Sequence, residues 1–258
     1  MLLIDQYAYA NKLSKVHPGE KMMFSILTML IGLMSGSVGI QMLLLLIMIV
    51  VTLYGAGIPW RVYLGLFIVP LSFIALGIVP IVFEVAKSGA GLIYSLGFLD
   101  LFIGLSKQGV PAALNIVSRS IMAVSCLYFL IFTTSMVDMM EQLRKVKIPN
   151  ITIELMMLIY RFIFVLLEAA ALIHHSQSAR LGYSNVRSAF SSLARLSSMI
   201  FVRSIHNSRA LGMSLASRGY SGDLRVLTYE YNLNRRNIAL ITLLEILLVV
   251  LCLYREGI

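Results

Sequence analysis

The sequence predicts an all-α integral membrane protein with about five transmembrane helices and a cytoplasmic arm of long, crossed amphipathic helices. Composition, the lengths of the apolar runs and the distribution of arginine predict this class. The chain of 258 residues is 59% hydrophobic and 13% charged, with a mean hydropathy of +0.88. Soluble domains are about 45–50% apolar and about 25% charged. Spans of about 20 residues each take up most of this length, which leaves no room for a large extramembrane catalytic domain.

The N-terminal region is polar. It carries Asp5, Lys12, Lys15, Glu20 and Lys21 before any apolar run begins. This lead is too long and too polar for a secretory signal. We therefore expect the first apolar segment to stay in the mature protein and the N-terminus to be cytoplasmic.

Six apolar runs are candidate spans, at residues 22–34, 38–54, 62–83, 110–136, 151–173 and 238–253. Pro18 is suited to a first helical turn and can start the first helix earlier. Gly32 and Gly36 either let a neighbouring helix approach or form the exit turn. Pro70 and Pro80 predict kinks in the third run, because each removes a backbone donor. The glycine-rich segment 84–109 is interpreted as an irregular loop or a shallow re-entrant piece.

Positive charges indicate how many of these runs cross the membrane, because cytoplasmic loops carry the excess of Lys and Arg. If all six cross, eleven basic residues lie outside and eight inside. If residues 151–173 instead lie along the cytoplasmic side, sixteen lie inside and three outside. The second arrangement predicts five spans: four in residues 1–136, a cytoplasmic arm at 137–237 and the last span in 238–258.

A polar stripe favours the same interpretation of residues 151–173. Glu154, Arg161, Glu168 and His175 recur every seven residues and so share one helix face. A helix buried in lipid rarely carries such a stripe. The alternative stays open that this run is a genuine span whose stripe faces a polar pathway, as in proton relays.

A second long helix is expected from about Ser184 to Ser217. Its small residues permit close crossing with another helix, while its methionine and phenylalanine side chains need an apolar surface to pack on. Two long amphipathic helices crossing below the membrane fit best. Gly182 and Gly219 are expected to end them, because glycine readily adopts the left-handed conformation that follows a helix C-terminus.

An arginine stands near Gly-Tyr-Ser at both expected helix ends. The copies are Ser178-Ala179-Arg180-Leu181-Gly182-Tyr183-Ser184 and Ala216-Ser217-Arg218-Gly219-Tyr220-Ser221. An arginine at a helix end contributes only about 0.3 to 1 kcal/mol through the helix dipole, which accounts for capping but not for the repeat. A guanidinium pairs strongly and directionally with a carboxylate. The repeat therefore predicts two docking points for an acidic partner.

These motifs resemble the transmembrane T component of energy-coupling-factor (ECF) transporters, and within that family the cobalt-type member. The family signature is a pair of Ala-Arg-Gly-like triplets on cytoplasmic coupling helices, here Ala179-Arg180-Leu181 and Ser217-Arg218-Gly219. The first triplet departs from the pattern, with Leu181 in place of glycine. The resemblance covers nearly the whole chain through residues 4–11, residues 16–21, Pro149, Glu154-Leu155, Tyr160-Arg161-Phe162 and residues 218–225.

The resemblance implies a scaffold in the plasma membrane of a prokaryote. It would join two ABC-type ATPase subunits in the cytoplasm to a metal-type, substrate-binding membrane subunit, for the cobalt uptake that serves cobalamin biosynthesis. It implies no catalytic residue, cofactor or resident metal, and the sequence has no G-x-x-x-x-G-K-[ST] loop for phosphate binding. Arg180 and Arg218 would each contact one ATPase, supported by Gly182, Tyr183, Tyr220 and Arg225. An apolar cradle would comprise Met156, Met157, Phe162, Phe164, Met199, Phe201 and Met213.

Other functions remain alternatives. The substrate of a T component could equally be nickel or a vitamin. A secondary transporter that needs no ATPase would use Arg119 and Glu245 as functional groups inside spans, although the two could simply form a structural pair. A membrane metalloenzyme would need its four histidines to converge, and no H-x-x-x-H pattern does this. Arginines interleaved with apolar residues favour the lipid bilayer or an acidic protein over nucleic acid as the partner.

Overall fold

The chain forms two compact units in the computed structural model, which describes residues 3–86, 92–98, 101–106, 109–220, 231 and 235–256. One unit, called the helical core unit, comprises Leu2–Ser135 and Glu230–Ile258. The other, called the arm, comprises Met136–Tyr229. The chain thus leaves the helical core unit after Ser135 and returns to it at Glu230.

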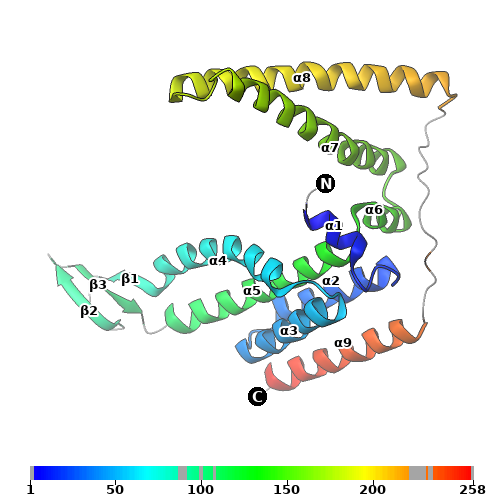
Figure 1. Cartoon of the computed structure of the whole chain (residues 1–258). Coiled ribbons are helices and arrows are strands. Elements are labelled where there is room, and N and C mark those ends of the chain that lie inside the picture. Colours follow the sequence, from blue (N-terminus) through cyan, green and yellow to red (C-terminus); the bar gives the residue numbers. More distant parts are fainter. Residues whose placement is uncertain are drawn as a thin grey trace. The chain divides into compact units, whose positions relative to one another are not determined.

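In the part of the helical core unit that the structure describes, six α-helices make up most of the chain (Figure 1). α2 begins at Pro18, and the Gly19 backbone N–H donates to Nδ1 of His17 at 3.0 Å, so a side chain caps its first turn. A π-helical turn, η1 (Val51–Gly55), directly extends α3. The α-helices are α1 (Leu3–Ala10), α2 (Pro18–Met34), α3 (Val38–Val50), α4 (Trp60–Val82), α5 (Gly109–Thr133) and α9 (Arg235–Glu256).

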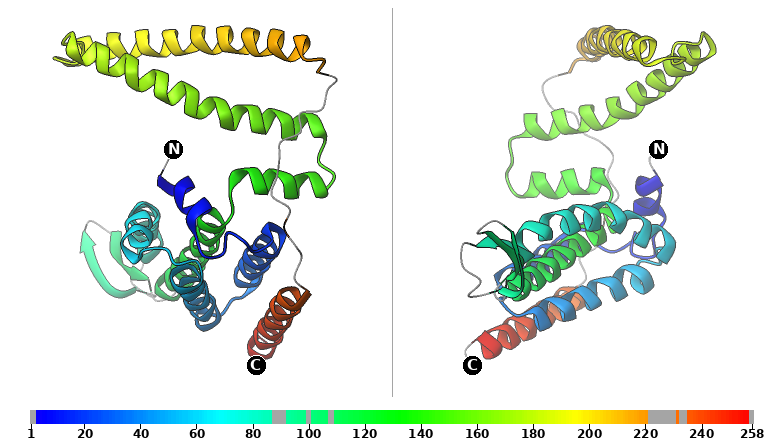
Figure 2. Two further views of the ribbon diagram at one scale, coloured as in Figure 1. Left: turned by 45° about the vertical axis from the view of Figure 1, so that its right-hand side comes forward. Right: turned by 90° about the vertical axis from the view of Figure 1, so that its left-hand side faces the viewer.

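Helix α5 lies at the centre of this unit and packs against α1, α2, α3 and α4 (Figure 2). Its Met122, Cys126 and Phe129 are buried in one apolar cluster with residues of α2, α3 and α9. Its Phe132 is buried in a second cluster, with Tyr63 and Phe67 of α4. α4 is helical through both Pro70 and Pro80.

The two glycines at the end of α2 have different roles. A Cβ on Gly32 would lie 2.1 Å from Cε of Met122, so this glycine makes room for the Met122 side chain of α5. Gly36 instead belongs to the exit turn, where its carbonyl accepts a hydrogen bond from Nδ2 of Asn115 at 2.5 Å. Arg119 of α5 also donates to this turn, from Nη2 to the Ser35 carbonyl at 3.1 Å.

Between α4 and α5, the described stretches form β-strands, which corrects the interpretation of residues 84–109 as an irregular loop; that this segment is a shallow re-entrant piece stays a prediction. It forms a three-stranded antiparallel sheet of β1 (Phe83–Ala86), β2 (Leu92–Phe98) and β3 (Leu101–Ser106) in the order β1-β3-β2. β3 is the central strand. Its Leu105 pairs with Phe83 of β1, and its Leu101 pairs with Phe98 of β2. The β-branched and aromatic residues of this segment suit strands, and the glycines between them obscured the pattern.

The arm consists of α6 (Met136–Lys145), α7 (Asn150–Ala179) and α8 (Val186–Ser217). α6 packs against α7, and α7 packs against α8. The chain reverses direction at a corner formed by residues 180–185, and α7 and α8 lie on the same side of this corner and diverge from it (Figure 1).

Among the described residues, five helical segments are long and apolar enough to cross a membrane: Val38–Gly55, Trp60–Val82, Gly109–Thr133, Asn150–Ala179 and Arg235–Tyr254. The class of an all-α integral membrane protein is confirmed. The membership of this set differs from the predicted spans, because it includes α7 and omits α2. At 17 residues, α2 lies at the lower limit of about 17 residues for a span. That α7 lies along the cytoplasmic side stays a prediction.

Polar side chains near the start of α2 secure the end of α5, where the chain passes into the arm. The buried Lys21 donates from Nζ to the carbonyls of Leu13 at 3.2 Å and Thr133 at 2.5 Å. Asn11 donates from Nδ2 to the Phe132 carbonyl at 3.1 Å. An ammonium group at a helix C-terminus also complements the negative end of the helix dipole. These contacts hold the last turn of α5 in place.

We expect Lys21→Met to lower the free energy of unfolding by about 1.5–3 kcal/mol, the usual contribution of a hydrogen bond to a charged group. Methionine keeps the apolar stem but leaves the two carbonyls without this donor. Thermal unfolding of the protein in detergent or nanodiscs measures the change. Lys15→Met, at an exposed position of the same segment, is the matched control and should unfold like the wild type. Equal stability of the two variants would contradict this role for Lys21.

Candidate functional site

The first arginine lies at the C-terminal end of α7. Arg180 is the C-cap, with φ −95° and ψ 18°. The next residue, Leu181, is left-handed at φ 58°, and its N–H donates to the Ser178 carbonyl at 3.0 Å. The N–H of Gly182 donates to the Gln177 carbonyl at 2.9 Å. This pair of reversed hydrogen bonds around a left-handed residue is a Schellman motif.

The second arginine lies in the same motif at the end of α8. Arg218 is the C-cap, with φ −95° and ψ 10°. Gly219 is left-handed at φ 71°, and its N–H donates to the Ala216 carbonyl at 3.1 Å. The N–H of Tyr220 donates to the Leu215 carbonyl at 3.0 Å. Arg180 and Arg218 therefore leave their helices with nearly the same backbone geometry.

This geometry aligns the two motifs on their arginines rather than on Gly-Tyr-Ser. Leu181 corresponds to Gly219 at the left-handed position, and Gly182 corresponds to Tyr220 one residue later. The expectation that Gly219 ends its helix in the left-handed conformation is correct. The same expectation for Gly182 is wrong, because Leu181 adopts that conformation instead. Leu181 in place of glycine thus adds strain to the first turn, but the turn keeps the same hydrogen-bonded motif.

Gly182 is needed for space. A Cβ at this position would lie 2.7 Å from Oγ of Ser192 and 2.8 Å from the Gln177 carbonyl oxygen. The Gly182 carbonyl accepts hydrogen bonds from Oγ of Ser188 and from Oγ of Ser192, both at 2.9 Å. The short distance between the turn and α8 thus depends on glycine at this position.

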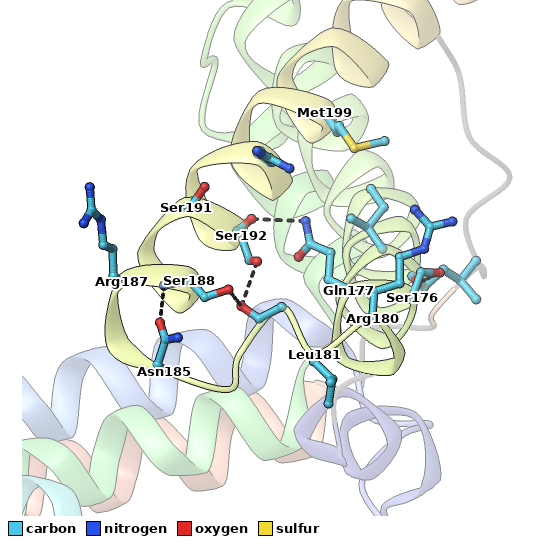
Figure 3. Close-up of a pocket in the computed structure, with 14 residues that line it drawn as sticks. Ser176, Gln177, Arg180, Leu181, Asn185, Arg187, Ser188, Ser191, Ser192 and Met199 are labelled. Carbon is cyan, nitrogen blue, oxygen red and sulfur yellow. Dashed lines mark hydrogen bonds between the residues drawn. The ribbon is translucent and has the colours of Figure 1, made fainter.

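Residues of both helices close the corner between α7 and α8 (Figure 3). Gln177 donates from Nε2 to the Ser192 carbonyl at 3.1 Å and accepts from Oη of Tyr183 at 2.8 Å. Oδ1 of Asn185 accepts the Ser188 backbone N–H at 2.8 Å, which caps the first turn of α8. Sequence reasoning missed Gln177, Asn185 and Ser192. An asparagine three residues before Ser188 is a helix-start signal, whereas the Gln177–Ser192 contact has no local signature.

The other end of α8 is held by a contact with the first turn of α7. Oη of Tyr220 donates to Oε2 of Glu154 at 2.6 Å. Glu154 is 2% exposed. Arg161, Glu168 and His175 are exposed, so the predicted polar stripe is divided between one buried and three exposed residues. The structure therefore brings together Glu154 of the stripe and Tyr220 of the second arginine motif.

Both arginine side chains are exposed and available. Within the part of the chain that the structure describes, neither the Arg180 nor the Arg218 guanidinium makes a hydrogen bond or an ion pair. Arg180 lies on the rim of a cleft of about 900 Å³ between α7 and α8, which Arg187 and Arg195 also line. The labelled side chains of Arg180 and Arg187 lie on opposite sides of the corner (Figure 3). Arg225 of the predicted site lies outside the described residues.

The arm also exposes large apolar side chains. Met199, Phe201 and Met213 of α8 are 55%, 65% and 70% exposed, and Phe190 is 72% exposed. An apolar surface of this kind commonly marks an interaction site for protein or membrane. Among the members of the predicted cradle, Met156, Met157, Phe162 and Phe164 on α7 are partly buried.

Arg119 and Glu245 do not form the structural pair that the sequence left open. Arg119 donates to the Ser35 carbonyl, whereas Glu245 contacts Oγ1 of Thr28 at 2.8 Å. The partner of Glu245 thus lies on α2, and the partner of Arg119 lies just after the C-terminal end of α2. Among the described residues, no group of three His, Cys, Asp or Glu side chains could hold a metal ion.

Comparison with known proteins shows a family. Residues 10–229 match the family model of the cobalt transport protein, CbiQ. The chain is 31% identical to the uncharacterized protein MJ1089 of Methanocaldococcus jannaschii over 249 residues, which cover 96% of this chain and 92% of the relative.

Two further relatives carry functional names. The cobalt transport protein CbiQ of Salmonella typhimurium is 25% identical over 86% of this chain and 99% of its own length. A putative fused cobalt transport protein, CbiMQ, of Methanocorpusculum labreanum is 30% identical over 85% of this chain and 37% of its own length.

Substitutions of the two left-handed residues, Leu181 and Gly219, should have opposite effects on the stability of their helix ends. Leu181→Gly should stabilise the α7 corner by about 1 kcal/mol, since a left-handed non-glycine residue costs about 1–2 kcal/mol. The Leu181 side chain is 75% exposed, so little packing is lost. Gly219→Ala should destabilise the α8 end by a similar amount, because nothing lies within 4 Å of the added Cβ and only the conformational cost remains. Hydrogen exchange of the amides at 178–182 and 216–220 measures both changes, and effects of the same sign would contradict the shared motif.

Proposed function

Because this chain belongs to the CbiQ family of cobalt transport proteins, we propose that it is the coupling subunit, or T component, of an ECF-type cobalt importer. In this role it transmits conformational changes of two cytoplasmic ABC-type ATPase subunits to a substrate-binding membrane subunit. The chain itself carries out no hydrolysis. The family and the five span-length helices make it a multi-pass membrane component of cobalt transport.

The observation that carries the proposal is the equivalence of the two arginine-capped helix ends. Arg180 and Arg218 have matching C-cap geometry, and neither guanidinium has a partner among the described residues. They stand at opposite ends of α8, whose 32 residues span about 48 Å at 1.5 Å per residue. Two equivalent cations at this separation suit two copies of an acidic pocket on two separate subunits better than one continuous partner.

The arm has the rigidity that transmission requires. α8 is one uninterrupted helix, and contacts with α7 hold it at both ends, through Gln177 and Ser192 at the corner and through Tyr220 and Glu154 at the other end. A displacement of either docking point therefore moves the whole of α8 rather than bending it. The exposed apolar residues Phe190, Phe201 and Met213 then offer the substrate-binding subunit a sliding surface, helped by the flexibility of methionine.

The fused relative supports a membrane partner. Its printed name joins a CbiM part to a CbiQ part, and the region similar to this chain covers 37% of its length. Two proteins fused in one organism commonly act together when they are separate in another. We infer that this chain binds a CbiM-like membrane subunit, which captures the metal.

We expect Arg180→Glu and Arg218→Glu each to weaken binding of the ATPase subunits by about 2–5 kcal/mol, because each reverses one charge of a desolvated pair. The double variant should fail to assemble with the ATPases while still inserting into the membrane. Co-purification with the ATPases of the same transporter measures assembly. Recovery of the intact complex with the double variant would refute the docking role.

Arg209→Glu is the matched control for this experiment. It makes the same charge reversal at an exposed position of α8 away from both helix ends. Assembly of this variant like the wild type would separate docking from a general effect of net charge. Metal uptake by vesicles that contain only this chain would instead favour the ATPase-independent transporter.

The orientation is tested by cysteine labelling. We propose that the arm and the N-terminus are cytoplasmic and that the C-terminus is outside. Ser178→Cys at the exposed corner should react with a membrane-impermeant maleimide only in inverted vesicles, and Tyr254→Cys only in intact cells. Background labelling is small, because both native cysteines are buried. Labelling of Ser178→Cys from outside would overturn this orientation.

A further inference from the structure

Glu245 is a carboxyl group in the middle of a membrane span. It lies in the Arg235–Tyr254 segment of α9 and is 5% exposed. Its neighbour Leu248 is buried in the apolar cluster that contains Phe24, Met122 and Cys126. It lies ten positions after Arg235 at one end of this segment and nine positions before Tyr254 at the other. The proposed coupling function assigns no role to this group.

The hydrogen bonds of Thr28 indicate whether the carboxyl group of Glu245 carries a proton. Oγ1 of Thr28 lies 2.7 Å from the Phe24 carbonyl oxygen and 2.8 Å from Oε1 of Glu245. A hydroxyl group has one hydrogen and two lone pairs, and a carbonyl oxygen cannot donate. The proton between Thr28 and Phe24 must therefore come from Thr28. No proton of Thr28 then remains for the contact with Glu245.

An ionised Glu245 leaves one of these two contacts without a proton. If Thr28 donated to a carboxylate, its oxygen would lie at hydrogen-bonding distance from the Phe24 carbonyl with nothing between them. A neutral Glu245 satisfies both contacts, because its own O–H supplies the second proton. The hydrogen-bond geometry of Thr28 therefore favours the neutral acid form of Glu245.

The second carboxyl oxygen leads to the same conclusion. Oε2 of Glu245 is buried and has no hydrogen-bond partner among the described residues. No described Lys, Arg or His forms an ion pair with Glu245. The groups that interact with it are the Thr28 hydroxyl from α2 and, electrostatically, the Cys126 thiol from α5. An unpaired carboxylate in such surroundings is costly enough that a buried group usually takes up a proton instead.

We propose that Glu245 is a proton-binding site in the middle of the bilayer, held as a neutral carboxylic acid at neutral pH. Its O–H donates to Oγ1 of Thr28, whose hydroxyl donates to the Phe24 carbonyl. This chain of two hydrogen bonds links α9 to α2, the helix against which α9 principally packs. At the membrane end of the same pair, Nδ2 of Asn237 donates to Oε2 of Glu20 at 3.1 Å. Two polar contacts, one near the surface and one at mid-span, thus position α9.

Infrared spectroscopy tests the protonation state directly. The C=O stretch of a carboxylic acid is separate from the amide and carboxylate bands. We expect the full chain in lipid nanodiscs to show an acid band at neutral pH that moves slightly in heavy water and is lost in Glu245→Gln. Glutamine keeps the shape and can still donate to Thr28, so it should preserve the fold.

Glu154→Gln is the matched control, because Glu154 is also buried but accepts its hydrogen bond from Tyr220 in the arm. The acid band should persist in this variant. Thr28→Val supplies a second readout that does not require a change at Glu245, since loss of the acceptor should raise the frequency of the acid band. A wild-type spectrum without an acid band at neutral pH, or an acid band unchanged in both Glu245→Gln and Thr28→Val, overturns the proposal.

Discussion

The ammonium group of Lys21 holds the point on which the rest of the chain depends. It donates to the carbonyl of Thr133, the last residue of α5, three residues before the arm begins at Met136. A helix that ends at the edge of an apolar unit leaves carbonyls without intrahelical partners, and a buried one is costly unless a donor reaches it. Lys21 and Asn11 supply those donors from the N-terminal region. The polar residues that precede the first apolar run therefore belong to the structural core of the junction.

Helix α2 extends this role to the place where the chain returns from the arm. Through Glu20 it contacts Asn237 at the start of α9, and through Thr28 it contacts Glu245 at mid-span. α2 thus contacts both the end of α5 and the start of α9. Under the proposed function, forces that reach the arm from the ATPases act on these two helix ends, which α2 contacts. This arrangement suits a subunit that has to transmit movement without separating its own helices.

The arginine motifs show which features of a helix end can be predicted from the local sequence. The positions of Arg180 and Arg218 at helix ends followed from glycine and from the limits of the apolar periodicity. The conformation of Leu181 could not be predicted, because a leucine is rarely left-handed and only the reversed hydrogen bonds around it make the turn visible. The role of Gly182 was likewise misassigned, since its value lies in the approach of Ser192, which is ten residues away. The sheet at 83–106 was missed because its pairing depends on β3 meeting two strands at once.

Composition and short-range pattern alone were sufficient for the membrane class, for the apolar helices and for the arginine-bearing helix ends. These features depend on local propensity and on transfer of side chains from water, which neighbouring residues decide. Only the folded chain decided that Lys21 reaches Thr133, that Tyr220 reaches Glu154 and that Glu245 meets Thr28 rather than Arg119. Such contacts join residues that are 66 to 217 positions apart in the chain. Their partners are selected by helix packing, because a buried polar group takes whichever donor or acceptor the tertiary structure brings within reach.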